Sequence, residues 1–75
     1  MDRQQDTPVR PLDRFLRRAE VESLTGLSRS TIYDKIAAGE FPRPVRLTGG
    51  AVAWVESEIA AWQAERIALR DVVRR

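Results

Sequence analysis

The sequence predicts a small, mainly helical domain with one β-hairpin. Three observations lead to this fold class. Two short helical patterns lie at residues 17–26 and 28–39, separated by a turn that contains glycine. Two β-prone runs then flank a glycine-rich turn at residues 48–51. A last apolar stripe with helical spacing, in residues 55–66, completes a pattern of three helices and a hairpin.

The first helix is expected to occupy about two turns and to end at Gly26, in the left-handed conformation that glycine favours. Glu20 and Glu22 are expected in its first turn, where the helix dipole favours acidic side chains. An extended segment precedes it. Four apolar residues of this region are expected to face the core: Phe15, Leu16, Val21 and Leu24.

The second helix is expected to run for roughly ten residues. Ser28 has the chemistry of an N-cap, and Gly39 closes the pattern. Ile32 and Ile36 form the inward stripe, and Tyr33 flanks the same face. Because only three or four residues separate the two helices, they are typical of a helix-turn-helix.

Proline residues rule out a helix in the segment that follows. Pro42 and Pro44 precede two β-prone runs, residues 45–47 and 52–54, which predict a hairpin or wing around a turn at residues 48–51. The whole pattern, over residues 14–66, therefore predicts a winged helix-turn-helix with three helices.

The third helix is expected to begin at Val55 or Glu56, with Val55, Ile59 and Trp62 on one face. The stripe is interrupted at Arg66, so docking to the core is expected to end there. Residues 67–75 are then either a solvated helical extension or flexible tail, or a contact for another chain. The candidate contacts between copies are Ile67, Leu69, Val72 and Val73.

Composition excludes several classes of function. The 75 residues include no cysteine and no histidine, which excludes a disulfide scaffold, a Cys/His zinc site and a Ser–His or Cys–His nucleophile. We expect no enzyme, no catalytic residues, no metal and no cofactor. Residues 1–13 are polar with two prolines, which predicts a disordered tail without the apolar core of a signal peptide. No apolar run approaches the ~20 residues of a membrane span, so we expect a cytoplasmic protein.

Charge is unevenly distributed along the chain. Residues 14–54 hold seven basic and four acidic residues, a net charge of +3, whereas residues 55–71 hold two basic and four acidic ones, a net charge of −2. A basic front half favours a polyanionic partner on one face. The alternative is a chance imbalance in a small protein.

Helical phasing of about 100° per residue assigns an outward face to the second helix. Ser30, Asp34 and Ala38 point outward, with Thr31 and Lys35 on one shoulder. Short polar side chains allow close approach to base edges in the major groove, and Asp can accept a bond from a cytosine amino group. The alternative is an ordinary helix start, because serine and threonine are common there.

Other residues extend the possible contact with nucleic acid. Arg29 lies in the first turn, within reach of a guanine edge or a phosphate, and Arg43 and Arg46 lie on the wing. Trp54 and Trp62 have the chemistry of a stacking platform for single strands, but their positions favour core packing. The combination of helices, turn and wing favours double-stranded DNA.

The chain resembles the AlpA family of phage and prophage regulators, which belongs to the MerR-like winged-helix group that also contains excisionases. The resemblance runs from Phe15 to about Glu65. It is carried by TGLSRSTIYDKIAAGEFPRPVRL (25–47), AVAW (51–54) and ESEIAAW (56–62). It implies sequence-specific binding of double-stranded DNA, transcriptional control of mobile-element genes, and an accessory role in excision. It also implies an integrase as a possible partner, and a bacterial or phage-encoded protein that joins the nucleoid when bound. Because one ten-residue helix spans only about 15 Å and covers a few base pairs, we further expect self-association on DNA.

The resemblance implies a recognition helix at residues 28–38 and a wing at residues 43–51. The DNA-binding residues so implied are Ser28, Arg29, Ser30, Thr31, Tyr33, Asp34, Lys35, Arg43, Arg46, Thr48, Gly49 and Gly50. Family members often carry a basic residue at the position of Asp34 and at the wing tip. These departures predict an altered target sequence or weaker binding. The alternative from another class is a protein–protein interaction module that has kept the fold and lost DNA binding.

Overall fold

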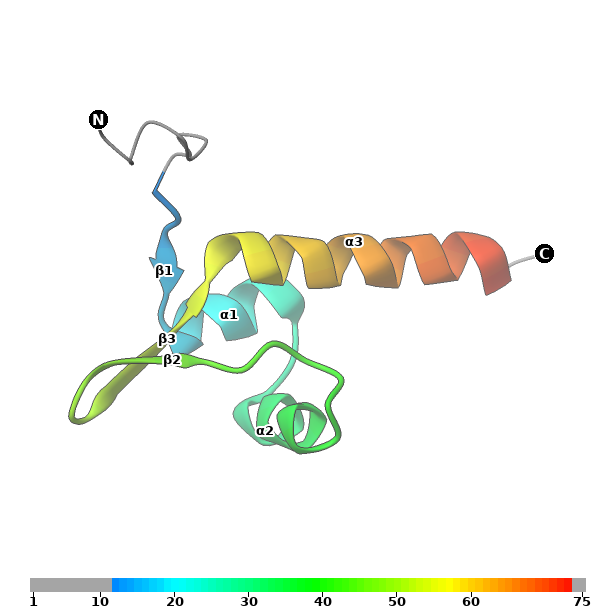
Figure 1. Ribbon diagram of the computed structural model, residues 1–75. Coiled ribbons are helices and arrows are strands. Elements are labelled where there is room, and N and C mark those ends of the chain that lie inside the picture. Colours follow the sequence, from blue (N-terminus) through cyan, green and yellow to red (C-terminus); the bar gives the residue numbers. More distant parts are fainter. Residues whose placement is uncertain (1–11, 74–75) are drawn as a thin grey trace, which may run out of the picture.

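A computed structural model describes residues 12–73 (Figure 1). The predicted tail therefore lies outside the described residues, except for its last two positions. Three helices and three strands follow one another along the chain: β1 Phe15–Leu16, α1 Arg18–Thr25, α2 Arg29–Ala37, β2 Val45–Thr48, β3 Ala51–Val55 and α3 Glu56–Val73. The predicted helices and hairpin are confirmed, and the arrangement is consistent with a winged helix-turn-helix.

The strands form one antiparallel sheet in the order β1-β3-β2. Thr48 pairs with Ala51, so the hairpin turn is only two residues long, shorter than the four residues expected. The register shifts between Arg46 and Thr48, which marks a bulge in β2. The strand β1 was not expected as part of a sheet. Its two residues pair with the far end of β3, and this long-range pairing holds the start of the domain against its last strand.

The core gathers residues from every element except β2. The buried apolar residues are Leu16, Val21, Ile32, Phe41, Ala53, Trp54 and Ile59. Trp54 is fully buried; its indole N–H donates to the carbonyl oxygen of Pro42 at 2.9 Å, and its ring meets the edge of Tyr33 at 6.2 Å between centroids. Trp54 therefore links α2, the following loop and the sheet, which confirms the prediction that it packs in the core.

The prediction that Phe15 and Leu24 face the core is wrong. Phe15 is 50% exposed because side chains alternate across a strand, and Leu16 takes the inward position. Leu24 is 51% exposed, although Val21 on the same helix is buried. A two-turn helix buries only a narrow stripe, and Leu24 lies about 60° from Val21 around it.

The acidic residues of α1 also differ from the prediction. The helix begins at Arg18, so Glu20 lies in its first turn as expected, but Glu22 does not. Glu22 instead accepts a bond from the Arg18 guanidinium, one turn earlier, at 3.1 Å. Glu20 caps the helix by accepting a bond from the backbone N–H of Arg17 at 3.1 Å.

The helix α3 begins at Glu56, so Val55 is the last residue of β3 rather than the first of the helix. Ile59 is buried and Trp62 is half-buried. Beyond this point α3 continues without a break to Val73 and projects past α1 and α2 (Figure 1). No helix among residues 12–73 is long and apolar enough to cross a membrane.

Candidate nucleic-acid interface

The turn between α1 and α2 consists of three residues, 26–28. Gly26 adopts a φ of 76°, and its N–H donates to the carbonyl oxygen of Glu22 at 2.8 Å. Any other residue would be strained there by the contact between its Cβ and the backbone. The left-handed glycine therefore redirects the chain within one residue and sets α2 across α1, as a helix-turn-helix requires.

The start of α2 is organised by two hydroxyl groups. Ser28 accepts a bond from the backbone N–H of Thr31 at 3.3 Å, which confirms it as the N-cap. Its hydroxyl also donates to the Thr31 hydroxyl oxygen at 3.1 Å. Because these two side chains bond each other, they hold the helix start in place and are less available to bases than the sequence predicted.

Three predicted contact residues project from α2 into solvent. Arg29, Ser30 and Asp34 are exposed. Ser30 and Asp34 lie opposite the buried Ile32, whereas Arg29 lies about 60° from Ile32 in the first turn. Within residues 12–73 no hydrogen bond or ion pair engages the side chains of Arg29, Ser30 or Asp34. Nothing in the described chain holds these side chains in one conformation, so their polar atoms can be offered to a partner.

The end of α2 is closed by Gly39 at a φ of 75°. The N–H of Gly39 donates to Ile36 at 3.0 Å and that of Glu40 to Lys35 at 2.8 Å, the pattern of a Schellman motif. The Lys35 ammonium lies 3.9 Å from the Glu40 carboxylate. Lys35 is therefore turned toward the end of the helix, away from the exposed group formed by Arg29, Ser30 and Asp34.

Tyr33 serves the fold as well as the surface. Its side chain is 37% exposed, while its ring packs edge-on against Trp54. The ring is therefore held in place, and only its outer edge is available to a ligand.

The wing carries its positive charge at its base and none at its tip. Arg43 and Arg46 are exposed and make no ion pair within residues 12–73. Thr48, Gly49 and Gly50 form the exposed tip of the hairpin. A Cβ added to either glycine would meet no atom within 4 Å, and neither adopts a left-handed φ. The wing tip would therefore accept larger or charged side chains without strain.

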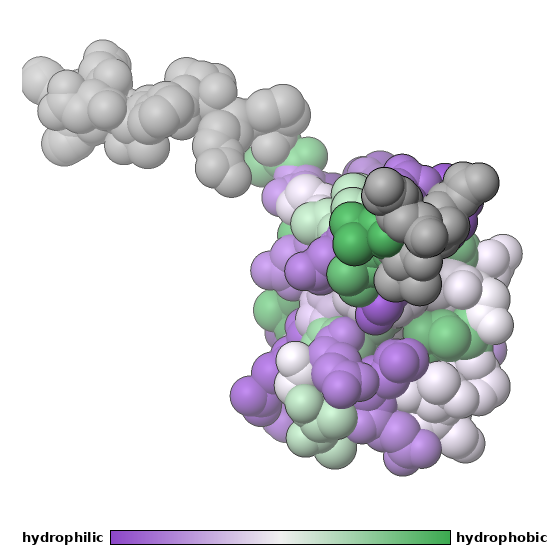
Figure 2. All heavy atoms as spheres, turned by 90° about the vertical axis from the view of Figure 1, so that its right-hand side faces the viewer, coloured by the Kyte–Doolittle hydropathy of each residue, from purple (hydrophilic) through white to green (hydrophobic). Residues whose placement is uncertain are grey.

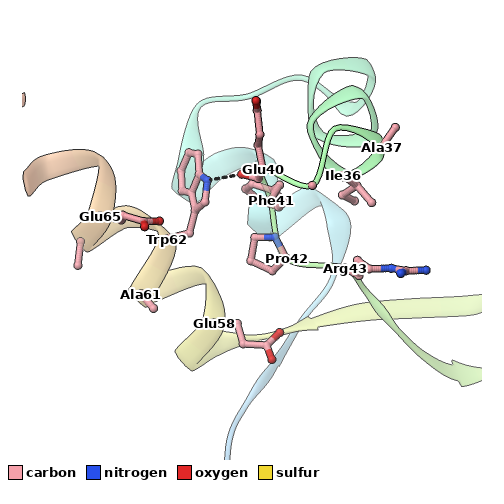
Figure 3. A pocket seen from close by; sticks show the side chains of 12 residues that line it. Ile36, Ala37, Glu40, Phe41, Pro42, Arg43, Glu58, Ala61, Trp62 and Glu65 are labelled. Carbon is pink, nitrogen blue, oxygen red and sulfur yellow. Dashed lines mark hydrogen bonds between the residues drawn. The ribbon is translucent and has the colours of Figure 1, made fainter. Parts of the chain in front are cut away.

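A second surface was missed at the sequence level. A groove lies between the segment after α2 and the side of α3 that faces this segment, and its lining includes Phe41, Pro42 and Trp62 (Figure 3). The signal available was the Phe41-Pro42 pair together with Trp62. Their distance in sequence concealed that they lie side by side.

The chain is similar to phage and bacterial proteins. Residues 14–67 match the family model described as "Prophage CP4-57 regulatory protein (AlpA)". A protein of Enterobacteria phage P4, described as "Uncharacterized protein ORF88", is 56% identical over 69 residues, covering 85% of this chain and 78% of that protein. The Escherichia coli (strain K12) protein described as "DNA-binding transcriptional activator AlpA" is 36% identical over 62 residues, covering 75% of this chain and 89% of that protein.

Proposed function

The chain belongs to the AlpA family of prophage regulatory proteins, and from this premise we propose that it binds double-stranded DNA at specific sequences and regulates the transcription of mobile-element genes. The observation that carries the proposal is the outward face of α2. It presents Ser30 and Asp34, and Arg29 extends beside this face from the first turn; none of the three has a partner among residues 12–73, and all lie on the second helix of a helix-turn-helix. The relative from Escherichia coli is itself described as a DNA-binding transcriptional activator.

In this proposal α2 enters the major groove. Arg29 reaches a guanine edge or a phosphate, Ser30 bonds a donor or acceptor edge, and Asp34 accepts a bond from a cytosine amino group. Ser28 and Thr31 hold the helix start, whose remaining backbone N–H groups point toward a phosphate. Asp34 is the only acidic residue in this set. Its carboxylate is repelled by the acceptor atoms of guanine, so guanine is disfavoured at the base that Asp34 contacts.

The wing supplies sequence-independent affinity. Arg43 and Arg46 lie at its base, where they can neutralise phosphates along the adjacent backbone. Lys35 contributes a further charge if its ammonium exchanges Glu40, 3.9 Å away, for a phosphate. Together with Arg29 these residues give four candidate phosphate contacts.

Several copies are expected to act together. The nine residues of α2 span about 13.5 Å at 1.5 Å per residue, which covers only a few base pairs. A site of that size recurs too often in a genome to specify one regulatory region. Tandem or inverted sites that bind several copies would supply the missing specificity.

The test is binding-site selection from random DNA, followed by titration of the selected single site at several salt concentrations. Four phosphate contacts predict a slope of log affinity against log salt of about −3.6, from about 0.9 for each contact. Arg43→Ala should reduce the slope by one contact, whereas Arg70→Ala, which removes the same charge at the far end of α3, should not. No enriched sequence and a slope near zero would contradict the proposal and favour the protein-interaction module.

An accessory role in excision forms the second part of the proposal. Its support is the family description, which is that of a prophage regulatory protein. Addition of the protein to a purified integrase and its attachment-site DNA should then shift the reaction toward excision. If the integrase excises equally well without it, the role is limited to transcription.

A further inference from the structure

The groove beside α3 has a rigid aromatic floor. Its volume is about 1190 Å³. The Trp62 indole N–H donates to the carbonyl oxygen of Glu40 at 3.1 Å, and the Trp62 ring meets the Phe41 ring edge-on at 5.0 Å (Figure 3). These contacts hold the indole before any ligand arrives, so a partner would not have to order the floor on binding.

The rim of the groove is acidic. Three carboxylates, those of Glu40, Glu58 and Glu65, line it, and Glu58 and Glu65 make no ion pair within residues 12–73. The Arg43 guanidinium extends away from α3 (Figure 3). An acidic rim repels the phosphates of DNA and favours a ligand that combines apolar side chains with positive charge.

The free end of α3 has that composition. Ile67, Leu69 and Val72 are 51%, 44% and 68% exposed. Residues 67–75 contain three arginines and one aspartate, and Arg70 bonds only its neighbour Asp71, at 3.3 Å, within the described chain. Figure 2 looks toward this end of α3 and shows hydrophobic surface beside it, next to hydrophilic side chains. Leu69 and Val72 lie about 60° apart on one side of the helix, whereas Ile67 lies on the side opposite Leu69. Neighbouring exposed apolar side chains such as Leu69 and Val72 are typical of a contact surface.

The two surfaces cannot meet within one molecule. Glu58, Trp62 and Glu65 of the groove belong to the same continuous helix as Ile67 and Val72. A straight helix cannot fold its own end back onto its side, so the end of α3 is available only to the groove of another copy.

We propose that the end of α3 from one copy binds in the groove beside α3 of a second copy. Leu69 and Val72 would cover the exposed part of the Trp62 ring, beside the Arg66 guanidinium that lies 5.9 Å from the ring centroid, and Arg70 would face the carboxylates of the rim. This inference goes beyond the proposed function, because it concerns contacts between copies and requires DNA only to bring them together.

The contact is head-to-tail, because each copy inserts the end of its α3 into one neighbour and binds the α3 end of another neighbour in its own groove. Such heterologous contacts do not close into a symmetric dimer and instead generate open rows. Because the contact would involve only the last turns of one helix, association should be weak for the free protein and much stronger for copies held close together on neighbouring sites.

Cysteine cross-linking tests the contact directly, because the natural chain has no cysteine. Ala61 lines the groove and Val72 lies on the free end of α3, and both are exposed. A mixture of Ala61→Cys and Val72→Cys chains at high concentration should yield a disulfide-linked pair with one chain of each kind, identified by mass spectrometry. Either variant alone should yield little. Efficient pairing of Val72→Cys with itself would overturn the proposal in favour of a symmetric contact between helix ends.

Charge reversal gives a second, independent measurement. On DNA with two selected sites at a series of spacings, the wild-type chain should bind the second site about tenfold or more tightly than the first at the best spacing. Glu65→Lys should abolish this cooperativity, and Glu65→Lys with Arg70→Glu in the same chain should restore it. Asp13→Lys, which adds the same charge away from the groove, should leave cooperativity intact.

The two proposals fail in different ways. Single-site affinity reports on the outward face of α2 and the wing, whereas cross-linking of the free protein and the difference between one and two sites report on the groove. Normal single-site binding with no cooperativity at any spacing and no mixed cross-link would overturn the head-to-tail contact alone. A mixed cross-link without specific DNA binding would overturn the proposed function alone.

Discussion

The outward face of α2 and the groove beside α3 differ in how the protein holds their side chains. On α2, Arg29, Ser30 and Asp34 have no bonding partner within residues 12–73 and can adjust to a ligand. In the groove, the Trp62 ring is held by a hydrogen bond and by an aromatic contact. Polar groups without an intramolecular partner suit the varied hydrogen-bonding edges of DNA, whereas an aromatic floor held by contacts suits an apolar partner.

Removal of Trp54 should disrupt both surfaces. Its ring packs against Tyr33 of α2, and its indole N–H bonds Pro42, which lines the groove. Trp54→Ala deletes a fully buried indole that links α2 to the sheet, and such a deletion costs about 3–5 kcal/mol. In a domain of this size the loss should unfold most molecules at 37 °C, as followed by circular dichroism during thermal unfolding. Trp54→Phe, which keeps an aromatic ring but loses the bond to Pro42, should remain folded; equal unfolding of both variants would contradict this account.

Trp62→Ala should impair the groove and leave the DNA-binding surface of α2 intact. The residue is half-buried, so the free energy of unfolding should fall by about 2 kcal/mol, less than for a fully buried indole. Single-site DNA affinity, measured by fluorescence anisotropy at 15 °C, should stay close to that of the wild type, while cooperativity on two sites is lost. A parallel loss of single-site affinity would show that the groove and the DNA surface are not independent.

The two serines at the start of α2, the N-cap Ser28 and the helical Ser30, offer a matched pair of substitutions. Ser28→Ala removes the N-cap and should lower the free energy of unfolding by about 1 kcal/mol. Ser30→Ala should leave stability nearly unchanged, because its hydroxyl makes no bond within residues 12–73, but should change the sequences recovered by binding-site selection. Chemical denaturation of both variants checks the first expectation. A stability loss as large for Ser30→Ala would contradict the assigned roles.

The smallest expected change is one additional phosphate contact, gained by a substitution at the wing tip. Gly50→Lys places a charge where an added Cβ meets no neighbouring atom, so the fold should tolerate it. One new phosphate contact would steepen the slope of log affinity against log salt by about 0.9. The neutral Gly50→Gln variant is the control and should leave the slope as it is. An unchanged slope for Gly50→Lys would place the wing tip away from the DNA backbone.

Much of the local structure follows from the sequence. Gly26 adopts the left-handed φ expected of it, Gly39 ends the helical pattern of α2 as expected and is also left-handed, and Ser28 caps α2 as expected. Ile32 is buried where helical phasing put it. The family resemblance carried by residues 25–47 is confirmed by the family match over residues 14–67. These features depend on neighbours within one or two turns of the chain, so sequence spacing is enough to predict them.

Other features depend on contacts between residues far apart in the chain, and only the tertiary structure shows them. The exposure of Phe15 and Leu24, and the pairing of β1 with β3, arise from which faces meet in the assembled domain. The groove has the same origin, because Phe41 and Trp62 become neighbours only when the loop after α2 packs on α3. Sequence spacing determines which way a side chain points on its own element. Only the packing of elements determines what it points at.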